Sequence, residues 1–320
     1  MPQKIIIDTD PGVDDAMAIQ FALNSPELEV IGLTTVYGNV NLELTTANAL
    51  KLLEAAGRGD IPVAKGAAKP LSRPFGGGVA FVHGDDGLGN IFSPESSLKP
   101  IAQSAEDFII EQIKKYPNEI ILAPLGPLTN IALALQKAPE IAELVKEVVI
   151  MGGNAFWPGN ASPAAEANIL NDPEAADYVL GACWPMVMIG LDVTETTLLS
   201  HKEGQEVRAG SDSELNKMVC DAYVFYEQFN TTNNKIDGSF LHDPSVIAYM
   251  IDASIFSGEE YLIRVETQDG LSLGKTWPFI GDEDVLARPA SEPWRGRPAV
   301  NVMLKVDNER LVTLLKERLK

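Results

Sequence analysis

Short apolar runs alternate with segments of helical periodicity through the first 190 residues of the chain. The apolar runs are rich in Val, Ile and Leu, which is typical of buried strands. We predict strands within 4–10, 28–38, 61–66, 118–126, 146–154 and 185–193. The segments between them repeat apolar residues every three or four positions, as amphipathic helices do. We predict helices within 14–25, 41–57, 104–117, 127–139 and 172–182.

This alternation is typical of a mostly parallel sheet covered by helices on both faces. After residue 200 the pattern becomes helical over 213–232 and 243–251. Two late strands, 260–268 and 298–307, are predicted to pair, and a helix closes the chain. We therefore expect one α/β domain over residues 1–320, with a Rossmann-like central sheet and extra C-terminal helices and strands.

The main irregular stretch of the sequence is 66–100. Its centre reads PFGGGVAFVHGDDGLGN and is rich in glycine. Long loops in compact domains are often functional, so we predict that this stretch contains a lid over an active site.

Composition narrows the classes of partner. The net charge of −20 and the absence of a basic patch argue against nucleic acid. The N-terminal residues do not resemble a signal peptide, and no run of 18 apolar residues predicts a membrane span. Cys183 and Cys220 are far apart in sequence and are expected to be buried thiols. We expect a cytoplasmic protein.

Four aspartates, Asp8, Asp10, Asp14 and Asp15, are crowded around the end of the first predicted strand. Helix capping explains one or two of them, because acids favour a helix N-terminus. It does not readily explain four carboxylates that repel one another. A hard dication such as Ca²⁺ or Mg²⁺ would neutralise the cluster. An EF-hand is excluded, because the twelfth position from Asp8 is Ile19 and not Glu.

Two kinds of chemistry remain for this motif. Asp8 could be the nucleophile of a haloacid-dehalogenase-like phosphatase, with GDEDV at 281–285 as its distal acids. Alternatively, the acids could hold a metal that activates water. A non-enzymatic calcium-binding module is a third reading.

Several sequence blocks resemble the nucleoside hydrolases, the inosine–uridine-preferring family of ribonucleoside N-glycosidases. The opening block is DTDPGVDDAMAI. The later blocks, in the order typical of the family, are VYGNV, VHGDDGLG, APLGPLTNIA, VVIMGG, GNASPAAEANILNDPEAA and LHDP. The resemblance covers most of the chain and implies hydrolysis of a ribonucleoside to free base and ribose.

The resemblance also implies a bound Ca²⁺. Its ligands would be Asp10, Asp15, Asp243 and the backbone carbonyl of Leu125, and oxygen ligands of this kind suit Ca²⁺. Asp10 would also accept the proton of the attacking water, and Asp14 would contact a ribose hydroxyl. Asp8 would support the site through hydrogen bonds from behind the ligands.

The remaining site residues follow from the same resemblance. Ribose contacts are assigned to Asn39, Asn160, Glu166 and Asn168, although an isolated Asn also suits a turn. His242 would assist the departing base as an acid or contact, and His83 would touch the base. A structural His beside a helix start and a solvated loop His are the alternatives. His201 is read as a surface residue.

One position departs from the family pattern. The usual AEFN reads AEAN here, so Ala167 replaces an aromatic residue on the base side. Phe156 or Trp157 could substitute for it, and Tyr226 with Phe229 could form another aromatic wall or simply pack in the core. The sequence leaves purine versus pyrimidine preference open. The resemblance implies a homotetramer or homodimer.

Overall fold

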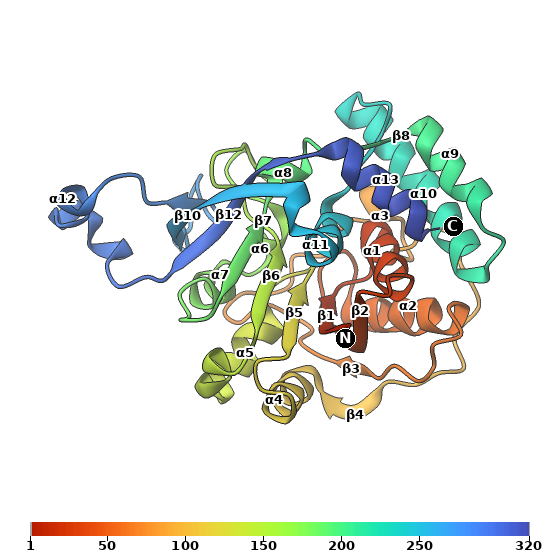
Figure 1. Ribbon diagram of the computed structural model, residues 1–320, viewed down its shortest axis with the longest axis horizontal. Coiled ribbons are helices and arrows are strands. Elements are labelled where there is room, and N and C mark those ends of the chain that lie inside the picture. Colours follow the sequence, from red (N-terminus) through yellow and green to blue (C-terminus); the bar gives the residue numbers. More distant parts are fainter. Residues whose placement is uncertain (1, 320) are drawn as a thin grey trace.

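A ten-stranded sheet forms the centre of the computed structural model, which describes residues 2–319 (Figure 1). Its strands, in spatial order, are β11 (Thr276–Pro278), β10 (Phe256–Val265), β12 (Ala299–Val306), β7 (Met186–Ile189), β6 (Glu147–Met151), β5 (Ile120–Pro124), β1 (Gln3–Thr9), β2 (Leu28–Thr35), β3 (Val63–Lys65) and β4 (Ile101–Ser104). β10 is antiparallel to both of its neighbours, and the other neighbouring strands of this sheet, within residues 2–319, pair in parallel. The predicted α/β class and the pairing of the two late strands are therefore confirmed.

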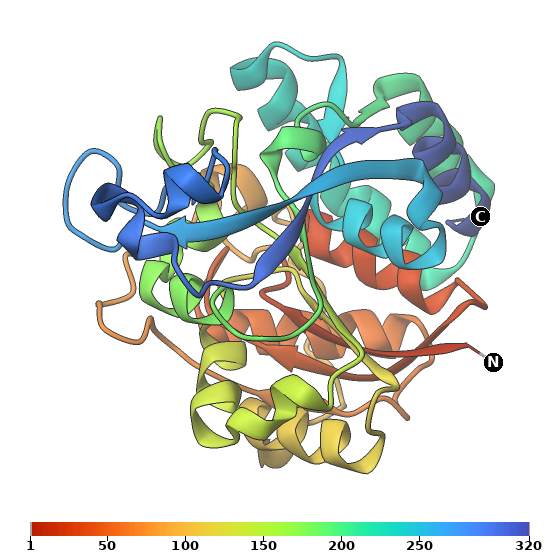
Figure 2. The same cartoon turned by 60° about the vertical axis from the view of Figure 1, so that its left-hand side comes forward.

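Helices cover both faces of the sheet, as Figure 2 shows. The alternation of β1 explains why, since Ile5 and Ile7 enter one hydrophobic core and Ile6 enters the other. The first core includes residues of α1 (Val13–Leu23), α2 (Leu42–Ala55), α10 (Glu214–Phe229), α11 (His242–Ile251) and α13 (Asn308–Arg318). The second includes residues of α4 (Ala105–Lys115), α5 (Thr129–Lys137), η1 (Pro139–Glu143), α6 (Ala167–Asn171) and α7 (Pro173–Val179).

Local signals in the sequence explain several helix boundaries. Asp172 caps α7 by accepting the backbone N–H of Ala175 at 3.1 Å, and Pro173 occupies the first helical position. Ser200 caps α9 (His201–Gly210), which places His201 on the surface as predicted. The helix predicted over 213–232 ends at Phe229 and continues as a π-helical turn, η2 (Asn230–Asn234).

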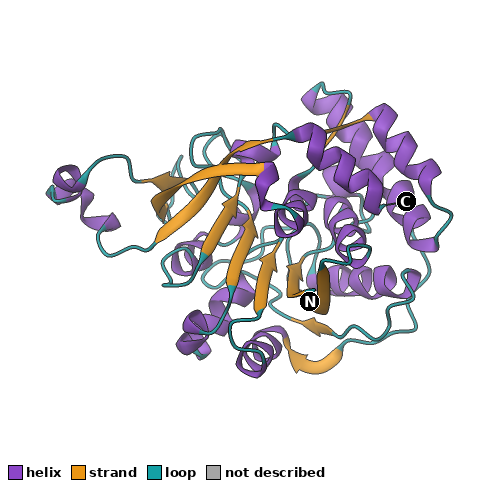
Figure 3. Ribbon diagram, in the orientation of Figure 1, coloured by secondary structure: helices purple, strands orange, loops and turns teal. Residues whose placement is uncertain are grey.

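Several short elements were not predicted. They include β4, β11, η1 and α6, and also α3 (Ala80–His83), α8 (Leu191–Thr194), β8 (Leu198–Ser200), β9 (Gly238–Phe240), η3 (Ala253–Ile255), α12 (Glu283–Leu286) and η4 (Pro289–Trp294). Strands β8 and β9 pair as a separate two-stranded sheet. The tips of β10 and β12, with α12, project away from the body of the molecule (Figure 3). Elements this short carry too little periodicity to be read from sequence.

The stretch 66–100 is anchored at its C-terminal half. The buried carboxylate of Asp86 accepts the backbone N–H groups of Leu88, Asn90 and Phe92. Gly89 adopts a positive φ and lies against the backbone of Ala222 in α10. The glycines at 76 and 77, by contrast, have open space around them. Whether this part closes as a lid stays a prediction.

Cys220 is buried and Cys183 is exposed, and both are free thiols. The expectation of two buried thiols was therefore wrong for Cys183, which follows the C-terminal end of α7. Within residues 2–319, no helix combines the length and the hydropathy needed to cross a bilayer.

Candidate active site

The site lies where the order of the sheet changes direction. Strands β2, β3 and β4 lie successively on one side of β1. The next strand in the chain, β5, lies on the other side of β1. Ligands of open α/β sheets bind at such a switch point, beyond the carboxyl ends of the strands. Asp10 follows β1 and Leu125 follows β5, so both lie at this edge.

Three carboxylates converge here from two helices. Oxygens of Asp14, Asp15 and Asp243 all lie within 4.8 Å of one another. Asp14 and Asp15 occupy the first turn of α1, and Asp243 occupies the first turn of α11, which packs against α1. The cap of α11 is Leu241, so Asp243 does not serve as the capping residue.

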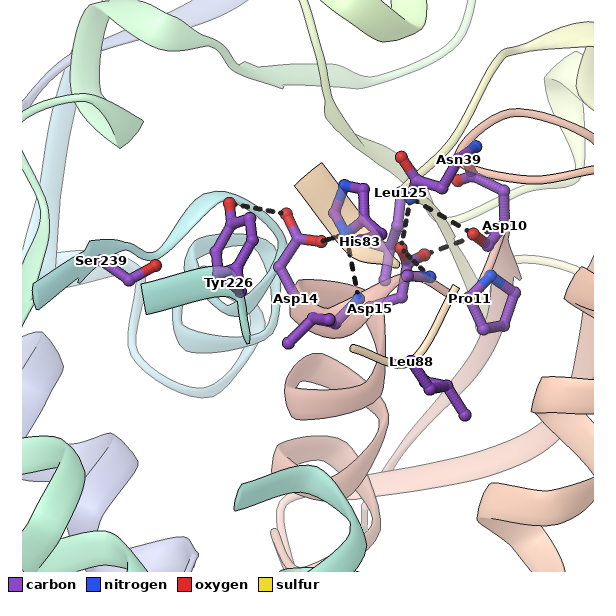
Figure 4. A network of polar contacts seen from close by, with 12 residues as sticks. Asp10, Pro11, Asp14, Asp15, Asn39, His83, Leu88, Leu125, Tyr226 and Ser239 are labelled. Atoms are coloured by element: carbon purple, nitrogen blue, oxygen red, sulfur yellow. Dashed lines mark hydrogen bonds and ion pairs between the residues drawn. The ribbon is translucent and has the colours of Figure 1, made fainter. Parts of the chain in front are cut away.

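Asp15 lies at the centre of a network of hydrogen bonds (Figure 4). Its Oδ1 accepts the hydroxyl of Thr9 at 2.5 Å, and its Oδ2 accepts the backbone N–H of Gly12 at 2.9 Å. The side-chain amide of Asn39 donates to Oδ2 at 3.0 Å. Asp15 thus accepts the backbone N–H of the N-cap residue of α1, so capping explains part of the role of Asp15 but not the other acids.

Asp10 keeps one oxygen without a partner. Its Oδ2 accepts the backbone N–H of Asn39 at 2.7 Å, while its buried Oδ1 has no hydrogen bond. Gly38 and Gly126 flank this carboxylate, and a Cβ at either position would collide with it. The backbone therefore approaches Asp10 closely, which only glycine allows.

Leu125 contributes a carbonyl oxygen to the same edge. The side-chain amide of Asn168 donates to this oxygen at 2.6 Å, and the backbone N–H of Leu125 donates to the carbonyl of Asp8 at 2.7 Å. Asp8 itself faces Thr34 and Asn130, which donate to its Oδ1 at 2.5 and 2.7 Å. The carboxylate of Asp8 thus contacts none of the other acids, and its supporting role stays a prediction.

Burial raises the pKa of every acid in the cluster. It raises the pKa of Asp8 to about 7 and those of Asp14 and Asp15 to about 6. Burial, followed by repulsion from Asp15, raises the pKa of Asp10 well above its usual range. Asp243 is shifted in the same direction by burial and then by Asp14.

These acids lack the usual compensation for buried charge. Within residues 2–319, no lysine or arginine forms an ion pair with any of them. Buried Oδ1 atoms of Asp10 and Asp14 have no hydrogen-bond partner. Several carboxylates with unpaired oxygens next to a backbone carbonyl form the donor set that a hard divalent cation prefers. The residues present therefore fit a divalent metal.

A cavity of about 400 Å³ opens beside the acids, a size that suits a small-molecule ligand. Asp14, Asn39, Leu125 and Asp243 line it on the acidic side. Its aromatic lining consists of Phe81, Tyr226, Phe229 and Phe240. Phe156 and Trp157 do not line it. Phe156 packs on Tyr261, and the indole of Trp157 donates to Glu195, so neither replaces the aromatic residue missing at Ala167.

Two of the three histidines line the cavity. The Nδ1 atom of His83 accepts the backbone N–H of Val13 at 3.2 Å, and its ring stacks on Tyr226. His83 is buried, which excludes a solvated loop residue. His242 holds Thr194 Oγ1 at 2.9 Å through its Nδ1. Burial lowers the pKa of each imidazole to about 4, so both are neutral near pH 7.

The loop before α6 supplies the remaining predicted residues, and all three line the cavity. Asn160 Oδ1 accepts the backbone N–H of Ala167 at 3.0 Å. Glu166 caps α6 through Asn168 and Ile169, and also accepts the N–H of Gly153 at 3.0 Å. The structure thus places the predicted site residues in the cavity lining or in the acid network beside it, except Asp8, whose carboxylate faces Thr34 and Asn130. Asp14, and not the predicted ligand Asp10, completes the group of three converging carboxylates, while Asp10 is linked to it through Asp15 and Asn39.

Sequence reasoning missed the residues of α8. Asp192 accepts the backbone N–H groups of Ala155, Phe156 and Trp157, and so fixes the start of the loop that carries Asn160. Thr194 contacts His242, and Glu195 lines the cavity. These residues follow a strand end, which was the available signal, but no spacing pattern distinguished them.

Comparison with known proteins decides what kind of site this is. The family described as "Inosine-uridine preferring nucleoside hydrolase" matches residues 5–313. The chain belongs to this family. This nucleoside hydrolase is 43% identical to "Probable uridine nucleosidase 2" of Arabidopsis thaliana, over 99% of this chain and 97% of that protein.

Solved structures of nucleoside hydrolases share the fold over their full length. A plant nucleoside hydrolase, PpNRh1, has a TM-score of 0.95 and 42% identity, covering 100% of this chain and 99% of that chain. A purine-preferring ribonucleoside hydrolase from Gardnerella vaginalis has a TM-score of 0.90 and 37% identity, covering 99% and 98%. Membership identifies an N-glycosidase of the metal-dependent hydrolase type. Family membership does not favour the two alternative hypotheses, a haloacid-dehalogenase-like phosphatase and a non-enzymatic calcium-binding module.

Proposed function

We propose that this nucleoside hydrolase cleaves ribonucleosides to free base and ribose with the help of a bound Ca²⁺. The supporting observation is the group of buried, unpaired carboxylates at the switch point, beside a cavity of about 400 Å³. The ligands would be Asp10, Asp15, Asp243 and the carbonyl oxygen of Leu125. When bound, the ion would offset the negative charge, orient ribose hydroxyls and make a water more acidic.

Asp10 would act as the base toward the attacking water. Its Oδ2 is held by the backbone N–H of Asn39, which leaves Oδ1 free to accept a proton. A base must lie within hydrogen-bond reach of the proton that it removes. Asp8 also has a free oxygen, Oδ2, but its carboxylate is bound to Thr34 and Asn130. Asp10 instead binds Asn39, which lines the cavity, and this supports the role for Asp10 over Asp8.

Five polar residues would bind the ribose hydroxyls: Asp14, Asn39, Asn160, Glu166 and Asn168. All five line the cavity. Contacts to several hydroxyls hold the sugar so that C1′ faces the attacking water, and orientation of this kind lowers the barrier substantially. An oxocarbenium-like state then forms as the C1′–N bond breaks.

His83 and His242 would face the base, with Tyr226 and Phe229 as aromatic neighbours. Because the pKa of each imidazole is lowered to about 4, we expect them to donate hydrogen bonds and not to serve as standing cations. The small Ala167 leaves the identity of the base open. The relatives are named for uridine and for purines, so both classes belong in the test.

The first experiment is ribose release from inosine, adenosine, guanosine, uridine and cytidine. Each is assayed with the metal-stripped protein, and again after addition of Ca²⁺ or Mg²⁺. We expect release that disappears on stripping and returns with Ca²⁺. Full activity in the stripped protein would contradict the metal's role, and no release from any nucleoside would contradict the substrate class.

Three further proposals follow, of which the first rests on the resemblance and the others on the sequence. The chain would form a homodimer or homotetramer, which light scattering can measure directly. The stretch 66–100 would close over bound substrate, which hydrogen exchange with and without ribose can test. A cytoplasmic location stays a prediction.

A further inference from the structure

Both cavity histidines are held through the same ring nitrogen. His83 Nδ1 accepts a backbone N–H from Val13, so its own N–H must be on Nε2. His242 Nδ1 lies 2.9 Å from Thr194 Oγ1, and either atom could donate in that contact. Within residues 2–319, no protein group hydrogen-bonds Nε2 of either ring. The second nitrogen of each imidazole is left for a ligand.

Thr194 is a rigid support for this contact. Its side chain is fully buried at the end of α8, and its backbone N–H donates to Gly190. Its hydroxyl has His242 as its only hydrogen-bond partner within residues 2–319. A buried hydroxyl with one partner is strongly oriented toward that partner, because leaving it unpaired costs free energy.

A second threonine, Thr197, hydrogen-bonds both the end of α8 and the residue before His242, but it does not contact the imidazole ring. Thr197 donates to the carbonyl of Thr194 at 2.7 Å and accepts the backbone N–H of Leu241 at 3.1 Å. Leu241 directly precedes His242. Thr197 is as buried as Thr194, so it offers a matched control for a purely structural contribution.

We propose that Thr194 is a positioning residue whose hydroxyl donates to His242 Nδ1 and thereby presents His242 Nε2–H to the departing base. The proposal rests on the proposed function, because it concerns the same reaction. When the C1′–N bond breaks, its electron pair stays on the base, and a hydrogen-bond donor stabilises that developing charge. The hydroxide part of the water bonds to C1′ and the remaining proton of the water goes to Asp10. The imidazole neither gains nor loses a proton.

The ring is also confined from the side. Phe240 contacts His242 edge to face, with ring centroids 5.8 Å apart. Phe240 restricts tilting of the ring, whereas the hydroxyl of Thr194 decides which ring nitrogen carries the proton. Removal of that hydroxyl should therefore leave the ring in place but remove the preference for Nε2–H.

The test compares Thr194→Val, Thr194→Ser and Thr197→Val on two kinds of substrate. The base of uridine or inosine is a poor leaving group, so its departure depends on a hydrogen-bond donor. The 4-nitrophenolate of 4-nitrophenyl β-D-ribofuranoside is a stable anion and depends on such a donor much less. For Thr194→Val we expect kcat on the nucleoside to fall roughly 10- to 100-fold. On the nitrophenyl riboside, kcat should stay within about threefold of wild type. KM should change little, and Thr194→Ser should restore most of the loss.

Thr197→Val should lower thermal stability without a selective effect on the nucleoside. In a His242→Ala background, Thr194→Val should cause no further loss, because the two residues act through one contact. An equal loss on both substrates, or an additive loss in that background, would overturn the proposal. Wild-type protein that hydrolyses no nucleoside would instead contradict the proposed function, so the two failures are distinguishable.

Discussion

The side-chain amide of Asn168 donates a hydrogen bond of 2.6 Å to the carbonyl oxygen of Leu125. Asn168 was assigned to ribose and Leu125 to the metal, yet one contact joins them. The same amide reaches the carbonyl of Met151 at 3.2 Å. The proposed sugar and metal sites therefore share a support at the ends of β5 and β6.

This contact predicts a double effect of Asn168→Ala. We expect Ca²⁺ affinity to fall roughly 10- to 100-fold, as is usual when a group that orients a ligand is removed. KM for the nucleoside should rise as well. Calorimetric titration with Ca²⁺ and steady-state kinetics at saturating Ca²⁺ separate the two effects. Unchanged Ca²⁺ affinity would show that Leu125 needs no such orientation.

Asp10→Asn should nearly abolish turnover. The amide keeps the size of the side chain but cannot accept the proton of water, so we expect kcat to fall roughly 10²- to 10⁴-fold. Circular dichroism should show a native fold. Asp212→Asn, the same change at an exposed position between α9 and α10, is the control and should leave kcat unchanged. Near-native turnover of Asp10→Asn would remove Asp10 from the mechanism.

The ribose 2′-hydroxyl should matter strongly. We expect 2′-deoxyuridine to be hydrolysed with a kcat/KM at least about 10²-fold below that of uridine, because polar groups built to bind the hydroxyl would be left unpaired. The measurement is ribose or deoxyribose release under identical conditions. Equal cleavage of both substrates would contradict the proposed role of this hydroxyl.

Metal-stripped protein should lose stability as the pH rises from 5 to 8. In the folded state burial raises the pKa of Asp8 to about 7 and those of Asp14 and Asp15 to about 6, all above the ordinary aspartate pKa of about 3.9. The folded state therefore binds more protons than the unfolded state in this range, and the free energy of unfolding falls as those protons leave.

Thermal melts at several pH values check this expectation. Titration of other groups contributes equally with and without metal, so the informative quantity is the difference between stripped and Ca²⁺-loaded protein. We expect stabilisation by Ca²⁺ to grow with pH, by a shift in Tm of a few degrees. A Ca²⁺-induced shift that is the same at pH 5 and pH 8 would contradict the assignment of these acids to the ion.

Much of the fold could be predicted because its signals are local. Ile5, Ile6 and Ile7 form a continuous apolar run, as expected for a strand covered on both faces. Asp172 followed by Pro173 predicted the start of α7, and the structure has it there. The short helix α8 was missed, since four residues do not display a helical period.

The sequence by itself determined the acidic cluster and the family. Asp10, Asp14 and Asp15 are close in the chain, so one strand end and one helix turn bring them together. Only the tertiary structure decided what surrounds them. Asp243 arrives on α11 from more than 200 residues away, and Thr194 meets His242 across 48 positions. Contacts over such separations depend on how helices pack on the sheet, and no local periodicity encodes which hydroxyl will face which ring.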